Sequence, residues 1–236
     1  MKFEAGGAAI ALDEGMIARP PQHVIFDCDG VLVDSEPIAN ACLAEALAGE
    51  GLVLEVAEIR RRYVGLSMAS VVAAVEVELG RALPDGWLDT LQAETFRQLR
   101  ECVKPVPHVR AAVEAIIEKG IRVSVASSGS QRKMTLTLGT TGLLGLFTPR
   151  LMSAEQVKRG KPYPDLFEAA ARISGIVPQN CVVIEDSVPG AQAAAAAGMR
   201  AFGYVGDPMS DAAGLKAAGA VLFDDMRKLP GLLGIG

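Results

Sequence analysis

From residue 109 to the end of the chain, short apolar runs that suit strands alternate with segments of helical periodicity. VRAAVEAIIEKG (109–120) has the apolar spacing of a helix that ends at a glycine, and IRVSVASSG (121–129) follows as a strand. The alternation continues through PDLFEAAARISG, CVVIEDS and PGAQAAAAAGM and closes with AFGYVGD and AVLFDD. Strands that alternate with helices build a mainly parallel sheet with helices on both faces. We therefore predict an α/β fold.

An earlier strand, VIF at 24–26, leads directly into two acidic residues and a glycine. Asp27 and Asp29 are separated by one residue, and residues two apart on an extended strand point to the same side. Like charges so close need a shared proton, a cationic side chain or a divalent metal to offset their repulsion. An ordinary turn is the alternative, because Asp and Gly are common turn residues. The rest of the chain has to decide between them.

Between this strand and the alternating part, residues 37–103 have a helical pattern. Apolar residues recur there at helical spacing, and glycines and prolines divide the run into three to five helices. Trp87, the only tryptophan, is expected to anchor their packing. KPVPHV (104–109) contains two prolines and reads as a connection back to the alternating part. We predict an inserted helical module at 37–103, a core made of 23–36 and 104–236, and an N-terminal extension at 1–22.

Composition excludes several classes of function. The chain of 236 residues is 50% hydrophobic and 22% charged, which is typical of a globular protein with a sizeable core. Its formal net charge of -5 provides no basic surface for nucleic acid or an anionic membrane. No segment has the apolar length needed to span a bilayer. Cys28, Cys42, Cys102 and Cys181 form no CxxC pair, so we expect free thiols and a cytoplasmic protein.

Further polar residues stand where predicted strands end or just before a helix. Each alone has an ordinary explanation as a turn, a solvated lysine or a helix cap. In a parallel sheet, however, ligands bind at the carboxyl ends of the strands, so residues at several of these ends predict one shared site. These residues are Ser127, Ser128, Lys161, Glu185 and Asp186.

The ordered set of motifs resembles the haloacid dehalogenase superfamily, and more closely its branch of small phosphatases and β-phosphoglucomutase-like sugar-phosphate mutases. The resemblance covers the chain from about residue 23 onward. It rests on DCDGVLVDSE at 27–36, on Ser127, on Lys161 within GKPYPD, and on EDS at 185–187. It implies a Rossmann-like core with an all-helical cap inserted after the first motif.

The resemblance also implies roles for the site residues. Asp27 would attack the phosphorus of a phosphate monoester and form an aspartyl-phosphate, for which a carboxylate needs no activating base. Asp29 would protonate the leaving alkoxide and then take a proton from the hydrolytic water. Ser127 and backbone N–H groups around Ser128 would bind phosphoryl oxygens, and Lys161 would offset the surplus negative charge.

A magnesium ion is the implied cofactor. The Asp27 carboxylate, the Asp29 backbone carbonyl and Asp186 would hold it, with Glu185 adjacent, and hard oxygen ligands fit Mg²⁺ better than zinc. The cap would close over the site and exclude bulk water. The expected contributors from the cap or its hinge are Glu36, Gly65, Leu66 and Ser67.

Two histidines are expected to have no part in the chemistry. His108 stands where relatives often carry glycine, and we interpret it as a tolerated turn substitution. His23 lies just before the first strand and is expected to be structural.

These residues predict a Mg²⁺-dependent phosphatase for a small phosphorylated metabolite, such as a sugar phosphate, acting as a monomer or weak dimer. A mutase is the first alternative. In the β-phosphoglucomutase pattern, a hinge histidine falls at Ala39 and a cap arginine at Met68, and neither residue can hold a phosphate or transfer a proton. Arg60, Arg61 or Arg62 would supply the missing cation if that alignment slips.

Two further alternatives are weaker. A haloacid dehalogenase would not require Asp29, because a halide leaving group needs no general acid. A non-catalytic phospho-ligand binder would not need every charged motif that the chain retains.

Overall fold

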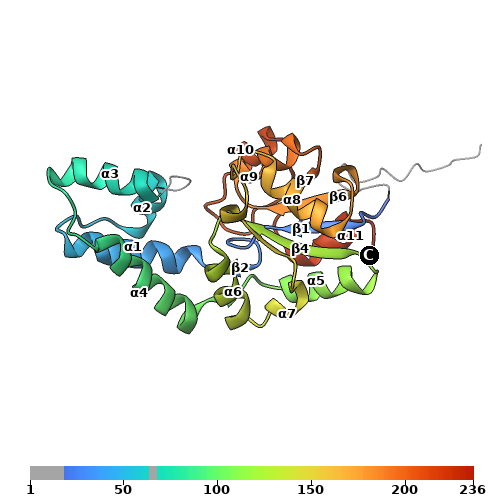
Figure 1. The fold of residues 1–236 in the computed structure, drawn as a ribbon, viewed down its shortest axis with the longest axis horizontal. Coiled ribbons are helices and arrows are strands. Elements are labelled where there is room, and N and C mark those ends of the chain that lie inside the picture. The colour runs from blue at the N-terminus through green and yellow to red at the C-terminus, as the bar shows by residue number, and fades with distance from the viewer. Residues whose placement is uncertain (1–18, 64–67) are drawn as a thin grey trace, which may run out of the picture.

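The computed structural model describes residues 19–63 and 68–236, and the structural statements that follow concern these residues. Six strands form one parallel sheet in the order β5-β4-β1-β6-β7-β8 (Figure 1). The predicted mainly parallel α/β fold is therefore confirmed. The strands are β1 (His23–Phe26), β4 (Arg122–Ser127), β5 (Leu151–Ser153), β6 (Cys181–Glu185), β7 (Arg200–Tyr204) and β8 (Val221–Phe223).

Strand β1 lies in the middle of the sheet and pairs on both sides. Phe26 is opposite Val125 of β4 on one side and Ile184 of β6 on the other. The chain runs from β1 outward through β4 to β5, and then returns to β6 on the opposite side of β1. In open α/β sheets, ligands bind outside the carboxyl ends of the strands at such a reversal. The topology thus predicts the site beyond Phe26.

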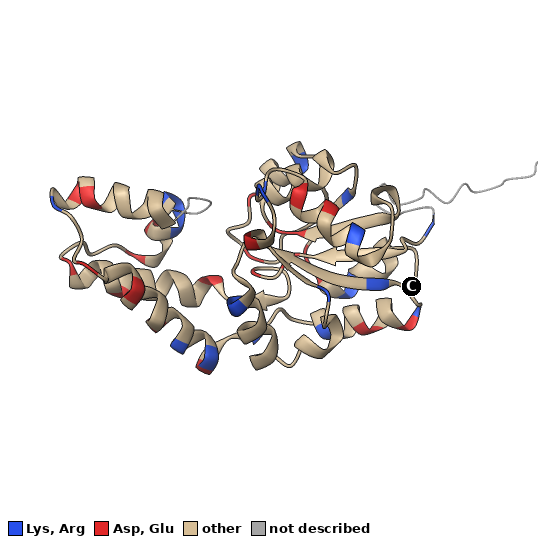
Figure 2. Cartoon of the chain, viewed as in Figure 1, with Lys and Arg blue, Asp and Glu red and all other residues tan. Residues whose placement is uncertain are grey.

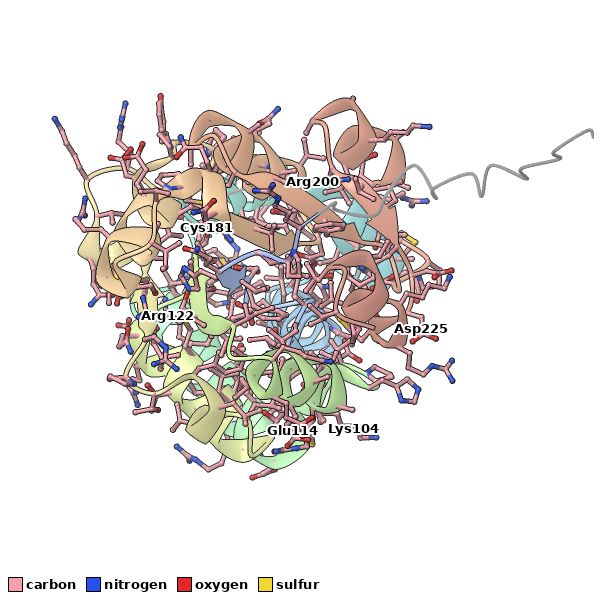
Figure 3. All side chains as sticks on the ribbon, turned by 90° about the vertical axis from the view of Figure 1, so that its right-hand side faces the viewer. Lys104, Glu114, Arg122, Cys181, Arg200 and Asp225 are labelled. Atoms are coloured by element: carbon pink, nitrogen blue, oxygen red, sulfur yellow. The ribbon has the colours of Figure 1, made fainter. Side chains whose placement is uncertain are left out.

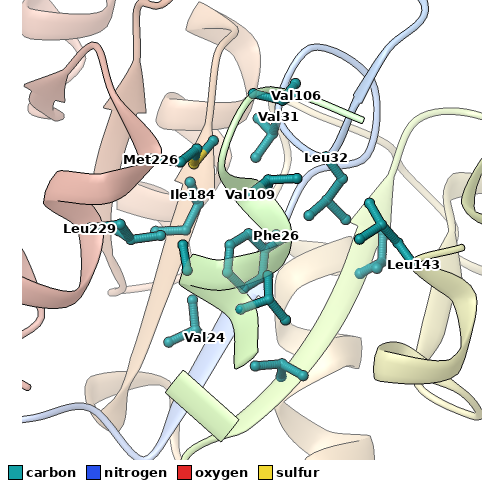
Figure 4. Packing of buried hydrophobic residues seen from close by; sticks show 14 of the residues in the cluster. Val24, Phe26, Val31, Leu32, Val106, Val109, Leu143, Ile184, Met226 and Leu229 are labelled. Atoms are coloured by element: carbon teal, nitrogen blue, oxygen red, sulfur yellow. The ribbon is translucent and has the colours of Figure 1, made fainter. Parts of the chain in front are cut away.

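Helices cover both faces of the sheet, as the alternating pattern predicts. Val24 and Phe26 belong to the core on one face (Figure 4). Ile25 belongs to the core on the other face, because neighbouring strand residues point to opposite sides. The first face is covered by α5 (Val109–Glu118), α6 (Gln131–Thr140), α7 (Leu144–Phe147) and α11 (Leu229–Leu232). The second is covered by α8 (Asp165–Ser174), α9 (Val188–Ala196) and α10 (Ala212–Ala217).

Four helices follow the first strand and lie beyond the end of the sheet, at the left of Figure 1. They have a hydrophobic core of their own, in which Leu47, Ile59 and Val75 are buried together with Trp87, the predicted packing anchor. We retain as a proposal that residues 37–103 fold as a separate cap domain. The helices are α1 (Glu36–Gly49), α2 (Val56–Tyr63), α3 (Met68–Leu79) and α4 (Trp87–Cys102).

The segment that we expected only to connect the cap to the core also forms a strand. Lys104–Pro105 is β3, and it pairs antiparallel with β2 (Val33–Asp34), so both crossings between core and cap lie side by side. Strands of two residues have no periodicity to detect, which is why the sequence did not reveal them. Three short 3₁₀ helices complete the described elements: Ala154–Gln156, Pro178–Asn180 and Met226–Lys228.

Two other expectations concern individual residues. His108 has a φ of 64° at the start of α5, so it occupies the left-handed conformation that suits glycine, as the predicted turn requires. All four cysteines are free, as expected, and Cys28 and Cys181 are buried. No helix within residues 19–63 and 68–236 combines the length and apolar character needed to cross a membrane.

Candidate active site

The two aspartates of the first motif follow β1 at the carboxyl end of the sheet. The Asp27 backbone N–H donates to the Ile184 carbonyl at 2.9 Å, which continues the strand ladder by one residue. Gly30 then has a φ of 76°, and its N–H donates to the Val33 carbonyl at 2.9 Å, which closes a tight turn directly after Asp29. Figure 2 shows acidic residues on the loops at this end of the sheet, facing α1 to α4.

Lys161 is the cation beside Asp27. Its Nζ lies 2.6 Å from Asp27 Oδ1 and 2.5 Å from Glu185 Oε1, and only 5% of the lysine side chain is exposed. Burial opposes the charge on Lys161, but the carboxylates of Asp27 and Glu185 outweigh it and raise the lysine pKa above its ordinary value. Lys161 therefore stays protonated and joins the ends of two neighbouring strands.

The acidic cluster at this point consists of Asp27, Glu185 and Asp186. One carboxylate oxygen from each lies within 4.8 Å of those of the others. Burial raises the pKa of Asp27 to about 7 even though Lys161 opposes this shift, and burial followed by repulsion from Glu185 raises the pKa of Asp186. Three carboxylates thus share one ammonium, and a divalent cation with oxygen ligands would relieve the remaining repulsion.

Asp186 packs tightly against the loop that follows β1. A Cβ built on Gly30 would lie 1.9 Å from Asp186 Oδ2, so the carboxylate packs directly against the glycine backbone. Only glycine leaves this space open. Asp27, Glu185 and Asp186 therefore offer the oxygen donors that a hard divalent cation prefers.

Glu185 is held from the other side by the start of α9. Its Oε2 accepts hydrogen bonds from the Asp186 N–H at 3.0 Å, and from the N–H and Oγ of Ser187 at 2.8 Å each. Gly190 allows the carboxylate to approach, because a Cβ there would lie 1.9 Å from Oε1. Glu185 is fixed in place and anchors Lys161, a contact that the sequence did not reveal.

The end of β4 and the loop after it contribute Ser127 and Gly129, and the backbone of Gly129 makes two hydrogen bonds to serine side chains. Ser127 is 1% exposed, and its Oγ accepts a hydrogen bond from the Gly129 N–H at 3.0 Å, which leaves its hydroxyl proton available to donate. The Gly129 carbonyl accepts from Ser153 Oγ at 2.7 Å. Ser128 is exposed, so its side chain does not belong to the buried group.

Asp29 has its own cationic partner, which the sequence analysis missed. Lys133 Nζ lies 2.8 Å from Asp29 Oδ1, and Ser35 Oγ donates to the same oxygen. Burial opposes the charge on Lys133, but Asp29 outweighs it and raises the lysine pKa. A signal was available: Lys133 lies three residues after the helix cap Ser130, where the helix dipole disfavours a cation.

Glu36 lies farther out, at the border between cap and core. Arg60 of α2 contacts it at 3.1 Å and also contacts Asp207, which follows β7, at 2.8 Å. Burial raises the pKa of Glu36, and Arg60 opposes this shift. Arg60 therefore links the cap to the core through two carboxylates.

Several other predicted cap positions can be compared with the structure. Gly65, Leu66 and Ser67 lie outside the described residues. Ala39 lies in α1, and Met68 begins α3 with 40% of its surface exposed.

The sequence is similar to known hydrolases along most of its length. The family model described as haloacid dehalogenase-like hydrolase matches residues 21–198. The chain is 31% identical over 188 residues to the 6-phosphogluconate phosphatase of Escherichia coli (strain K12), covering 79% of this chain and 84% of that protein. It is 30% identical over 204 residues to the phosphorylated carbohydrates phosphatase of Thermotoga maritima, covering 85% and 92% respectively.

A solved structure shares both fold and sequence with the chain. The HAD family hydrolase from Deinococcus radiodurans R1, crystallised with bound phosphate and sodium, has a TM-score of 0.79 and 32% identity, covering 91% of this chain and 96% of that one. The predicted enzyme class, a phosphoric monoester hydrolase, is confirmed by the family match and by the phosphatases among the relatives. The chain belongs to the haloacid dehalogenase-like hydrolases.

Proposed function

We propose that this protein is a Mg²⁺-dependent phosphatase that hydrolyses a small phosphorylated sugar or similar metabolite through an aspartyl-phosphate intermediate. One observation carries the proposal: the buried Lys161 ammonium contacts both Asp27 and Glu185, beside Asp186, at the carboxyl end of the sheet. This arrangement combines a carboxylate nucleophile with the positive charge that a dianionic substrate requires.

Asp27 would be the nucleophile. Its Oδ1 is held by Lys161 at 2.6 Å, so its other oxygen, Oδ2, would attack phosphorus while the bond to the leaving oxygen breaks. Lys161 favours the ionised form of Asp27, which burial otherwise disfavours. The hydroxyl of Ser127 would donate to a phosphoryl oxygen at the end of β4.

Asp27, the Asp29 carbonyl and Asp186 would hold the magnesium ion, with Glu185 adjacent. When bound, Mg²⁺ supplies positive charge that neutralises the phosphoryl oxygens and the crowded carboxylates. Asp29 would donate a proton to the leaving oxygen and later accept one from water.

Water is proposed as the final phosphoryl acceptor. A mutase must keep its aspartyl-phosphate from water until the sugar returns, and the positions of the mutase histidine and arginine hold Ala39 and Met68. Two of the three alternative arginines pair with carboxylates of this chain, Arg60 with Glu36 and Asp207, and Arg62 with Glu58 and Glu78. Together with Ala39 and Met68, these ion pairs support hydrolysis over a mutase reaction.

The test is a comparison of Asp27→Asn with wild type on a panel of 6-phosphogluconate, fructose 1-phosphate, glucitol 6-phosphate, phosphoglycolate and AMP. We expect wild type to release phosphate from a sugar or polyol phosphate with Mg²⁺, to stop in chelator and to recover when Mg²⁺ returns. Asp27→Asn should lose more than about 1,000-fold in turnover, because an amide is a poor nucleophile of nearly the same size.

Asp34→Asn is the matched control, since Asp34 is an exposed aspartate of the same motif and should remain active. Circular dichroism verifies that each variant is folded. Substantial turnover by folded Asp27→Asn would contradict the nucleophile assignment, and full activity in chelator would contradict the metal.

A further inference from the structure

Lys133 occupies a position that helix formation does not favour. It lies in the first turn of α6, where the helix dipole repels a cation, and its backbone N–H already donates to the cap Ser130 Oγ at 3.1 Å. Its side chain is nevertheless three-quarters buried and reaches Asp29. A buried cation at an unfavourable helix position indicates a purpose other than stability.

The two oxygens of Asp29 have unequal surroundings. Oδ1 accepts from both Ser35 Oγ and Lys133 Nζ, while no hydrogen-bond donor from residues 19–63 or 68–236 is found on Oδ2. Oδ2 instead lies 3.4 Å from the point where a Cβ on Gly129 would stand, and Ser127 Oγ lies 3.4 Å from that same point. Oδ2 and Ser127 Oγ, the proposed phosphate contact, therefore both border the same space beside Gly129.

We propose that Lys133 is a positioning residue that holds Asp29 through Oδ1 and so aims Oδ2 at the leaving oxygen of the substrate. The proposal rests on the proposed function, in which Asp29 is the general acid. Because Oδ1 already accepts from Ser35 and Lys133, Oδ2 is the oxygen that this role requires to carry the transferable proton.

Lys133 would act in both half-reactions. As Asp27 forms its bond to phosphorus and the bond to the leaving oxygen breaks, the proton on Oδ2 moves to that oxygen. The Asp29 carboxylate that results keeps its contact with the Lys133 ammonium. Water then bonds to phosphorus, its proton returns to Oδ2, and the bond between phosphorus and Asp27 breaks, which releases phosphate and restores both carboxyl groups.

Two other roles for Lys133 make different predictions. If it only packed α6 onto the loop, where its side chain approaches Gly129, its removal would slow every substrate alike. If it bound the phosphate directly, its removal would raise KM equally for all phosphate esters. Only a residue that acts through the general acid discriminates between leaving groups, because an aryl phosphate releases a phenolate that needs no proton.

The experiment compares single-turnover phosphorylation rates of wild type, Lys133→Met and Asp29→Asn. The substrates are p-nitrophenyl phosphate and the alkyl phosphate that wild type turns over fastest in the panel above. We expect Lys133→Met to lose about 10- to 100-fold on the alkyl phosphate and to stay within about twofold on the aryl phosphate. Lys133→Arg should restore most of the alkyl rate, because it keeps the charge.

Lys119→Met is the matched control, since Lys119 is an exposed lysine at the end of α5 and should leave both rates unchanged. Folded Lys133→Met that loses activity equally on both substrates, or loses none, would overturn the proposal. In that case a selective loss in Asp29→Asn would still support Asp29 as the general acid. If Asp29→Asn lost activity equally on the alkyl and the aryl phosphate, Asp29 would not be the general acid. The proposed role of Lys133 would then be wrong as well.

Discussion

At the residue scale, the acidic cluster depends on the missing side chain of Gly30. The Asp186 carboxylate occupies the space that a Cβ would need, and the φ of 76° further favours glycine. One methyl group at this position would therefore have two effects, backbone strain and displacement of Asp186. The two effects can be separated by the same substitution at another glycine with a positive φ, where an added Cβ causes backbone strain but meets no neighbouring side chain.

Gly30→Ala should raise the Mg²⁺ concentration needed for half-maximal activity by about tenfold or more, because displaced ligands typically weaken a metal site to this extent. A Mg²⁺ titration of phosphate release measures the change. Gly120→Ala is the control, since Gly120 has a φ of 74° and a Cβ added there would meet no atom within 4 Å. An unchanged Mg²⁺ requirement in Gly30→Ala would count against the placement of Asp186 in the metal site.

At the element scale, helix α5 begins from a strained residue. His108 is the only described residue other than glycine with a positive φ, and its side chain is exposed. The left-handed conformation costs a residue with a Cβ about 1 kcal/mol relative to glycine. The strain of the turn that returns the chain from the cap to the core is therefore concentrated at this residue.

His108→Gly should be more stable than His108→Ala by about 1 kcal/mol, because both remove the imidazole and only glycine relieves the strain. Urea denaturation followed by circular dichroism provides the two free energies of unfolding. Equal stability of the two variants would mean that the turn relaxes without cost.

At the scale of the whole molecule, the opposite end of the sheet contains a buried histidine. His23 is fully buried, and its Nε2 lies 2.8 Å from Ser124 Oγ and 3.2 Å from Ser174 Oγ. Arg122 and Cys181, which mark this end in Figure 3, belong to the strands on either side of it. Burial, with Arg150 and Arg122 adding to it, lowers the pKa of His23 to about 4.

This pKa predicts a loss of stability in mild acid. The unfolded chain takes up a proton at His23 near its ordinary pKa of 6.5, while the folded protein resists it until about 4. The free energy of unfolding should therefore fall by up to about 3 kcal/mol as the pH drops through this window, and the fall should level off below it.

His23→Asn should remove that part of the pH dependence, since asparagine is neutral throughout and can still bond to a serine hydroxyl. Urea denaturation of both proteins at pH 7, 5.5 and 4.5 isolates the contribution of His23, because the carboxyl groups titrate in both. Parallel curves for the two proteins would rule out His23 as the source.

The sequence by itself determined the layers and the end of the sheet where the site lies. Alternating strand and helix patterns require parallel strands, and polar residues that follow apolar runs then meet at one edge. This reasoning needs only local periodicity, and from it Asp27, Ser127, Glu185 and Asp186 were expected at that edge, while their proposed roles came from the family resemblance. It also predicted the helices between 37 and 103, where apolar residues recur at regular helical spacing over a long segment.

Only the tertiary structure showed that Lys161 contacts Glu185 as well as Asp27, and that Lys133 is the partner of Asp29. Lys161 meets Asp27 across 134 residues, and Arg60 meets Asp207 across 147. Lys133 reaches Asp29 only because α6 packs beside the loop after β1. Such pairings depend on how whole helices pack against the sheet, and a periodic pattern contains no information about that packing. The sequence predicts the elements and their edges, and the packing of distant elements selects the contacts between them.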